Sequence, residues 1–176
     1  MSQAPLMIQR SCQIPVPVSD CFAIFSRLKP NEFIHSDLVI EPIIKIDRFG
    51  GNQFTEVGDV QRITFKSGAS IEEELLAFIP GRQFVYRGTG FTQPLLSWLD
   101  HAKGSFEFEG LGDETRVTWR YTFYLRDGLG QTAKRAVFNA LVVNGLWNRL
   151  MNKTLVNLKQ IVTLRALKPA RKASRV

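Results

Sequence analysis

The sequence predicts an α+β domain in which a curved antiparallel sheet of about seven strands closes around one long C-terminal helix. Two observations support this prediction. From Leu38 to Arg126, apolar and polar residues alternate with a period of two, which is typical of strands that bury one face. From Gln131 to Leu167 the chain has no proline and carries apolar residues at helical spacing. Because only one long helix is available, the sheet must curl around it to bury both apolar surfaces.

The elements are expected in the order of one strand, two short helices, about six strands and the long helix. Met7 to Pro15 is the first strand, Ser19-Asp20 offers an N-cap to the first helix, and Asn31 to Ser36 forms a second helical turn. The remaining strands are expected at Leu38–Asp47 (with Ile40, Ile44 and Ile46 on one face), Val60–Lys66, Ser70–Ile79, Gln83–Arg87, Ser105–Glu109 and Thr115–Arg126. Turns are expected at Phe49–Asn52 and Gly128–Gly130.

The long helix is predicted from one apolar stripe. Its members are Trp147, Leu150, Met151, Thr154, Leu155, Leu158, Ile161 and Val162. A straight helix from Gln131 to Leu167 would be ~50 Å long, which exceeds the width of a compact domain of this size. We therefore expect a bend or a break near Gly145, or a loop at the start of this range.

Charge is unevenly distributed along the 176 residues. The formal net charge is +7, and residues 165–176 contribute five positive charges and no negative one, which leaves +2 for residues 1–164. We predict one ligand-binding domain at residues 1–165 and a basic, disordered tail at 166–176. The tail is either a solvated terminus or a segment that makes transient contact with an anionic membrane.

Several classes of protein are disfavoured. Cys12 and Cys21 are the only cysteines and are expected to be thiols in a reducing compartment. No segment resembles a signal peptide or a membrane span, so the protein is expected in the cytoplasm.

Glu107 and Glu109 are expected to offset the positive charge of the arginines on the neighbouring strand, which disfavours a specific nucleic-acid surface. The oligomeric state stays open.

Four short patterns carry a resemblance to a known family. They are Ile14-Pro15-Val16-Pro17-Val18 with Cys21-Phe22, Val57-Gly58-Asp59 with Arg62–Phe65, Ile71–Leu75 running to Pro80-Gly81-Arg82, and Thr115–Tyr121. In these patterns and their order, the chain resembles the START-like superfamily, also called SRPBCC or Bet v 1-like, especially its polyketide cyclase/dehydrase and lipid-transport branch. The resemblance implies a helix-grip fold with a deep cavity that binds lipids, sterols, polyketides or other hydrophobic molecules. It does not imply one chemistry, because members include carriers and enzymes.

The cavity is expected to be lined by both the sheet and the helix. The candidates are Ile63, Phe65, Glu73, Leu75, Tyr86, Phe106, Phe108, Trp119, Tyr121, Phe123, Asn144, Trp147, Met151 and Leu155. Alternation places Glu73 on one face with Ile71 and Leu75, where desolvation would raise the pKa of its carboxyl group. The alternatives are that this face is the outer one, that Glu73 pairs with a basic residue, that the aromatic residues belong to an ordinary core, and that Asn144 marks a helix boundary.

Residues 88–100 are too numerous for a hairpin turn and unusually apolar for an exposed loop. Phe91, Leu95, Trp98 and His101 are the candidates for a lid or a cavity mouth. The alternative is a segment that merely caps the sheet.

Three functions are compatible with these observations. The first is a carrier or sensor of a hydrophobic molecule, and the second is a cyclase- or dehydratase-like lyase or isomerase that uses Glu73 or Tyr121 as acid or base. The third is an interaction module with a filled interior, which a cavity below ~300 Å³ would favour. A roomy cavity with Glu73 beside another titratable group would favour the enzyme. No metal or other cofactor is expected, because His35 and His101 have no metal-binding spacing and nucleotide motifs are absent.

Overall fold

The computed structural model describes residues 4–37, 40–49, 53–128 and 130–173, with side chains described as far as Leu167. Its elements are β1 (Leu6–Ile14), α1 (Val18–Phe25), α2 (Pro30–Phe33), β2 (Ile43–Phe49), β3 (Val60–Phe65), β4 (Ser70–Ile79), β5 (Gln83–Thr89), the 3-10 helix η1 (Leu96–Trp98), β6 (Leu99–Leu111), β7 (Glu114–Leu125), α3 (Gln131–Phe138), the π-helix η2 (Asn139–Trp147) and α4 (Asn148–Ala173).

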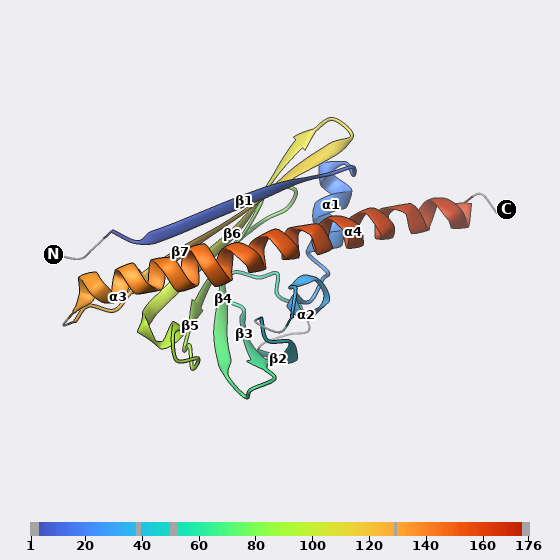
Figure 1. The fold of residues 1–176 in the computed structure, drawn as a ribbon. Coiled ribbons are helices and arrows are strands. Elements are labelled where there is room, and N and C mark those ends of the chain that lie inside the picture. The colour runs from blue at the N-terminus through green and yellow to red at the C-terminus, as the bar shows by residue number, and fades with distance from the viewer. Residues whose placement is uncertain (1–3, 38–39, 50–52, 129, 174–176) are drawn as a thin grey trace.

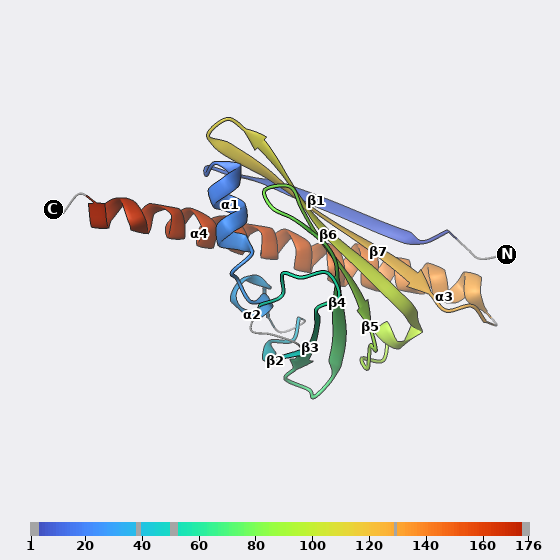
Figure 2. The same cartoon turned by 180° about the vertical axis from the view of Figure 1, so that it is seen from behind.

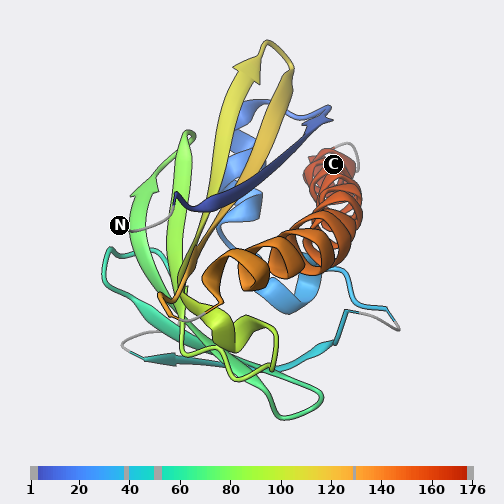
Figure 3. The same ribbon diagram turned by 60° about the vertical axis from the view of Figure 1, so that its left-hand side comes forward.

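The strands of the described residues form one antiparallel sheet in the order β1-β7-β6-β5-β4-β3-β2. The sheet curves, and α4 lies across its hollow side (Figure 3). The predicted helix-grip architecture is therefore confirmed. None of the described helices is long and apolar enough to span a membrane.

Strict alternation explains the central hairpin of β6 and β7. Val117, Trp119, Tyr121 and Phe123 alternate along β7 and are buried. On the opposite face, Arg116 pairs with Glu109 at 2.7 Å and Arg120 with Glu107 at 3.0 Å, across the two strands. The expected charge offset on this face is therefore present.

The C-terminal helical region forms one continuous rod of α3, η2 and α4 (Figures 1 and 2). The predicted apolar stripe is buried from Trp147 to Val162, with Ile161 half-buried. The helix is not broken near Gly145 and has no loop at its start, since α3 begins at Gln131; its irregularity there is the π-helix η2, whose turns are wider than those of an α-helix. The helix continues past the expected boundary at residue 165, and Arg165 is held by Glu32 of α2 at 2.5 Å.

Several predicted boundaries differ from the structure. Strand β2 begins at Ile43, and its register shifts between Ile43 and Lys45, so Ile44 is 61% exposed instead of buried. Strand β6 begins at Leu99, well before the predicted Ser105. Helix α1 begins after Pro17 without a side-chain N-cap, so the predicted cap at Ser19-Asp20 is wrong.

Parts of other predictions fall outside the described residues. These parts are Leu38 and Val39 in the predicted strand, residues 50–52 and 129 in the predicted turns, and the last three residues of the tail, 174–176.

Aromatic packing fills one end of the concave face. Phe22 of α1 packs edge-on against Phe108, with ring centroids 5.0 Å apart, and Phe25 packs against Phe106 at 4.8 Å. The two cysteines are free thiols, as expected. Burial raises the pKa of Cys12 and of Cys21 to about 11, so neither is a reactive thiolate near neutral pH.

Candidate functional site

A cavity of about 420 Å³ lies between the concave face of the sheet and the helical rod. Its walls come from the sheet strands, from η2 and the first turn of α4, from the end of α1 through α2 to the start of β2, and from residues 93–96. Most of its lining is apolar, with phenylalanine, isoleucine and leucine side chains predominating. This volume lies within the range of about 300–1,000 Å³ that is typical of small-molecule sites. The interior is therefore not filled by side chains.

The structure brings many of the predicted cavity residues together. Those that line the cavity are Ile63, Phe65, Glu73, Tyr86, Phe106, Trp119, Tyr121 and Trp147. Those that lie in the core instead are Leu75, Phe108, Phe123, Met151 and Leu155.

Two causes explain three of the residues that lie elsewhere, Phe108, Phe123 and Asn144. Helices occupy the space over the sheet at both ends, since Phe108 packs on Phe22 of α1 and Phe123 on Phe138 of α3. Asn144 is exposed, so its predicted place in the cavity wall is wrong. It lies in η2, where the turns hold more residues than in an α-helix and a projection at 3.6 residues per turn fails.

The partly buried carboxyl group of Glu73 is the main polar feature of the sheet wall. Glu73 on β4 faces Gln61 on β3 in direct cross-strand register, and Gln61 Nε2 donates a hydrogen bond to Glu73 Oε2 at 2.8 Å. Burial raises the pKa of Glu73 to about 7, and the hydrogen bond from Gln61 opposes part of that rise. The carboxyl group can therefore gain or lose a proton near neutral pH.

An aromatic cluster lies beside Glu73. Trp119 Nε1 donates a hydrogen bond to the Tyr86 hydroxyl at 3.3 Å, and the Tyr121 ring lies 6.2 Å from that of Tyr86. Burial raises the pKa of both tyrosines, and their electrostatic interaction with Glu73 raises it further. Both hydroxyls therefore stay protonated near neutral pH and can donate hydrogen bonds.

Two glycines on the concave face make room for this cluster. Gly104 of β6 pairs with Tyr86 on one side and Tyr121 on the other. A Cβ atom at Gly104 would lie only 2.2 Å from the Tyr86 ring, so the missing side chain lets that ring lie against the strand. Gly88, the cross-strand partner of Glu73, makes room for the Phe91 ring, because a Cβ atom there would lie 3.2 Å from that ring and 3.8 Å from the Tyr121 hydroxyl.

The apolar segment before β6 closes one side of the cavity. Gln93, Pro94, Leu95 and Leu96 line it, and Leu95 is 39% exposed. Of the other predicted mouth residues, Phe91 is buried against Gly88, whereas Trp98 and His101 do not line the cavity.

His101 is held on the opposite face of the sheet. Its ring stacks on Tyr124 with centroids 4.1 Å apart, and Nδ1 lies 2.7 Å from Asp100. The alternation of β6 turns this side chain away from the cavity.

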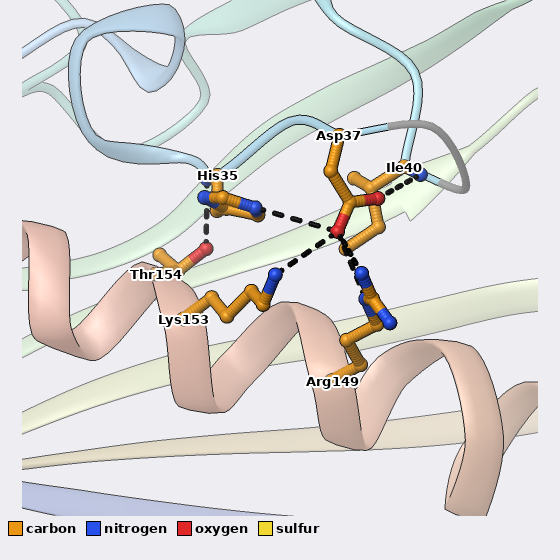
Figure 4. A network of polar contacts seen from close by, with 6 residues as sticks. All are labelled: His35, Asp37, Ile40, Arg149, Lys153 and Thr154. Atoms are coloured by element: carbon orange, nitrogen blue, oxygen red, sulfur yellow. Dashed lines mark hydrogen bonds and ion pairs between the residues drawn. The ribbon is translucent and has the colours of Figure 1, made fainter.

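A polar network ties the segment between α2 and β2 to α4 (Figure 4). The Asp37 carboxylate accepts hydrogen bonds from Arg149 Nε at 2.8 Å, Lys153 Nζ at 3.2 Å and the Ile40 main chain at 3.0 Å. Next to it, the main-chain N–H of His35 donates to Thr154 Oγ1 at 3.0 Å. Because Ile34, Ile40 and Glu41 of this segment line the cavity, the network holds one of its walls in place.

Several lining residues were not among the sequence candidates. Gln61 alternates with Ile63 and Phe65 along one strand, so its inward direction is contained in the pattern. Phe33, Phe54 and Arg48 reach the cavity from segments whose periodicity gives no such signal. The described residues contain no cluster of metal-ligating side chains.

Residues 6–163 match the model of a family described as polyketide cyclase / dehydrase and lipid transport. The chain belongs to this family. Its place in the SRPBCC or Bet v 1-like superfamily is thereby confirmed. No curated protein sequence matches the chain at a significant level.

Solved structures share the fold of this polyketide cyclase / dehydrase and lipid transport family member at low identity. The Zhui aromatase/cyclase of a Streptomyces species has a TM-score of 0.66 at 14% identity, with 93% of this chain and 96% of that chain covered. Norcoclaurine synthase from Thalictrum flavum, in complex with dopamine and hydroxybenzaldehyde, has a TM-score of 0.65 at 13% identity, covering 95% and 89%. Ara h 8.0201 has a TM-score of 0.55 at 15% identity, covering 90% and 98%.

Proposed function

We propose that this protein binds an apolar small molecule in the cavity between sheet and helix, as a carrier or sensor. The observation that carries the proposal is a cavity of about 420 Å³ with mostly apolar walls and one hydrogen-bonded carboxyl–amide pair, Glu73 and Gln61. The apolar walls would hold the body of the ligand, and the polar pair would fix its orientation. Lipid transport in the description of the family supports this function.

Acid–base catalysis is the second candidate, because Glu73 lies within electrostatic range of two tyrosines. A general acid or base works best with a pKa near the operating pH, and burial raises that of Glu73 to about 7. In a dehydration, the Glu73 carboxylate would take the proton next to a substrate carbonyl, while Tyr86 or Tyr121 donates a hydrogen bond to the carbonyl oxygen. The proton would then pass to the departing hydroxyl, which leaves as water.

Native mass spectrometry of the protein purified from its host tests the binding function. We expect the native protein to have a higher mass than the polypeptide alone, and denaturation to release the difference as a hydrophobic compound. The variant Ile63→Trp fills the cavity from β3 and should lose this excess. The variant Ile44→Trp places the same side chain on the exposed face of β2 and should keep it. If both variants fold and carry equal amounts of bound compound, the proposal is contradicted.

The variant Glu73→Gln separates carrier from enzyme in the same measurement. If the protein is a carrier, the wild type and the variant should release the same compound. If it is a dehydratase, the compound bound to the variant should be heavier by one water, because the variant would retain unreacted substrate.

A further inference from the structure

A groove of about 700 Å³ lies between β1 and α4, and its lining shares no residue with that of the cavity. Ser11, Cys12 and Pro15 form its β1 side, and Cys12 Sγ lies 3.8 Å from the Leu155 carbonyl oxygen on the helix. Neighbouring residues of a strand point to opposite faces of its sheet. Because both Ser11 and Cys12 line the groove, it follows the edge of β1 and not one of its faces.

Strand β1 is an edge strand without the usual protection of an edge. In the described part of the chain it pairs with β7 alone, in continuous register from Leu6 to Ile14. It contains no proline, lysine or bulge, which commonly keep an edge from pairing with another chain. The other edge strand, β2, has a bulge and an exposed Lys45–Asp47 pair. The edge of β1 can therefore accept a further strand.

The α4 side of the groove presents one cationic side chain between two apolar ones. Val156 is 56% exposed and Leu164 is 62% exposed, and Lys159 lies between them. At 1.5 Å per residue, Val156 and Leu164 are ~12 Å apart along the helix axis. In an extended chain, two residues that are four positions apart are separated by ~13 Å and lie on the same face. The spacing of the helix therefore matches that of an extended peptide.

The helical rod has no negative charge of its own. All 16 acidic residues come before residue 128, whereas residues 128–176 carry ten basic residues and no acidic one. Asp37 and Glu32 pair with other cationic side chains of α4, and Lys159 has no ion pair with any of the described residues. A carboxylate in the groove would therefore complement the charge of its wall.

We propose that the groove between β1 and α4 binds an extended acidic segment of a partner protein, which adds to β1 as a further strand. Apolar side chains at the first and fifth positions of the segment would lie on Val156 and Leu164, and an acidic side chain at the third would meet Lys159. Main-chain hydrogen bonds with β1 give affinity, and the alternate side chains give selectivity. The surface is separate from the cavity, so the proposal is independent of ligand binding there.

Other occupants fit this groove less well. A second copy of the chain would bring a rod with the same positive charge against the first. A lipid has no main chain to pair with the edge of β1. The described lining of the groove contains no aromatic side chain on which a nucleic-acid base could stack.

Labelled peptides of seven residues test the proposal by fluorescence anisotropy at low salt. The acidic probe has leucine at positions two and six, aspartate at position four and threonine elsewhere, so one face carries all three groups. The basic probe has lysine in place of aspartate, and the shuffled probe has its leucines at positions three and five, on the other face. We expect the acidic probe to bind about fivefold or more tightly than the basic one, and about tenfold or more tightly than the shuffled one.

Two variants with the same change of charge assign the preference to the groove. Lys159→Glu should reverse it, so that the basic probe binds more tightly than the acidic one. Lys103→Glu, at an exposed position of β6, is the matched control and should keep the preference of the wild type. If Lys159→Glu fails to fold, hydrogen exchange of the wild type decides the question, because the acidic probe should slow amide exchange in residues 11–14.

Several results would overturn the proposal. They are equal binding of the acidic and basic probes, equal behaviour of the two variants, and unchanged amide exchange in β1. If the acidic probe does not bind and Lys159→Glu abolishes cosedimentation with anionic vesicles, the surface serves a membrane instead. If the chain forms a dimer that Val156→Glu separates, the surface serves a second copy. None of these results would affect ligand binding in the cavity.

Discussion

Glu73 is hydrogen-bonded to a neutral amide inside an apolar wall, and this environment governs its protonation. Burial raises its pKa from an ordinary carboxyl value to about 7 in the folded protein. Between the unfolded and folded pKa values, the folded state holds a proton that the unfolded state has lost. The free energy of unfolding of the unliganded protein should therefore fall as the pH rises through this window and level off above about 7.

Glu73→Gln should remove this pH dependence. The variant keeps a side-chain oxygen that can accept the Gln61 hydrogen bond, but it has no proton to lose. We expect it to gain on the order of 2 kcal/mol of stability over the wild type at pH 8 and little at pH 4.5. Urea unfolding across this pH range measures the difference. A constant difference between the two proteins would show that Glu73 titrates normally.

The direction of a single side chain can be predicted from the sequence more easily than its partner. Alternation within a strand places Glu73 on one face with Ile71 and Leu75, and Arg116 on the face opposite Val117 and Trp119, but it leaves open which face of β4 points inward. The partnership of Glu73 with Gln61 does not follow from alternation, because it depends on the register between β3 and β4. Asn144 was placed wrongly because a π-helix cannot be distinguished from an α-helix by composition.

At the scale of elements, predictions succeeded where one face is purely apolar. Strand β4 has the predicted bounds, Ser70–Ile79, between two clear turns. Strand β2 was misread because Ile43, Ile44 and Ile46 put apolar residues on both faces, and a bulge then decides which of them point inward. The long helix was found because its stripe continues for many turns.

Residues 34–37 and 40–42, between α2 and β2, have no regular secondary structure, and polar contacts hold them against α4. The Asp37 side chain is 16% exposed and meets two cationic side chains of α4. Charged hydrogen bonds at such a site stabilise more than ordinary surface pairs.

Asp37→Asn should loosen this wall of the cavity. We expect a loss of about 1–2 kcal/mol of stability, faster amide hydrogen exchange in residues 34–37 and 40–41, and faster entry and release of a bound ligand. Asp47→Asn is the control, since it removes the more exposed Lys45–Asp47 pair and should cost about 0.5 kcal/mol or less. Equal effects of the two variants would mean that the network does not restrain the wall.

At the scale of the molecule, the sequence predicted a hollow between sheet and helix but not its volume. Alternation shows which residues point inward, yet the free volume depends on how side chains from distant elements meet. Phe22 and Phe25 of α1 fill one end. Gly88 and Gly104 let the rings of Phe91 and Tyr86 lie close against the sheet.

The basic C-terminal segment also belongs to this scale. In Figure 1 the C-terminal end of α4 projects beyond the sheet, and residues 168–176 add Lys168, Arg171, Lys172 and Arg175 by sequence. We propose that this end contacts anionic membranes during ligand exchange.

A chain ending at Leu167 should lose this contact while keeping the buried stripe, which ends at Val162. We expect the full-length chain to cosediment with vesicles of phosphatidylcholine and phosphatidylserine at low salt, and the shortened chain to bind more weakly by ~1 kcal/mol for each basic residue removed. Vesicles of phosphatidylcholine alone are the control. Equal sedimentation of both chains with anionic vesicles would contradict the proposal.

The contact between Gly104 and Tyr86 offers one place at which the volume of the cavity can be changed. The tyrosine ring rests where a methyl group would otherwise be, so any other residue at position 104 must push the ring into the chamber or force a smaller residue at position 86. Paired changes at these two positions are therefore a direct way to redesign the protein for guests of a different size.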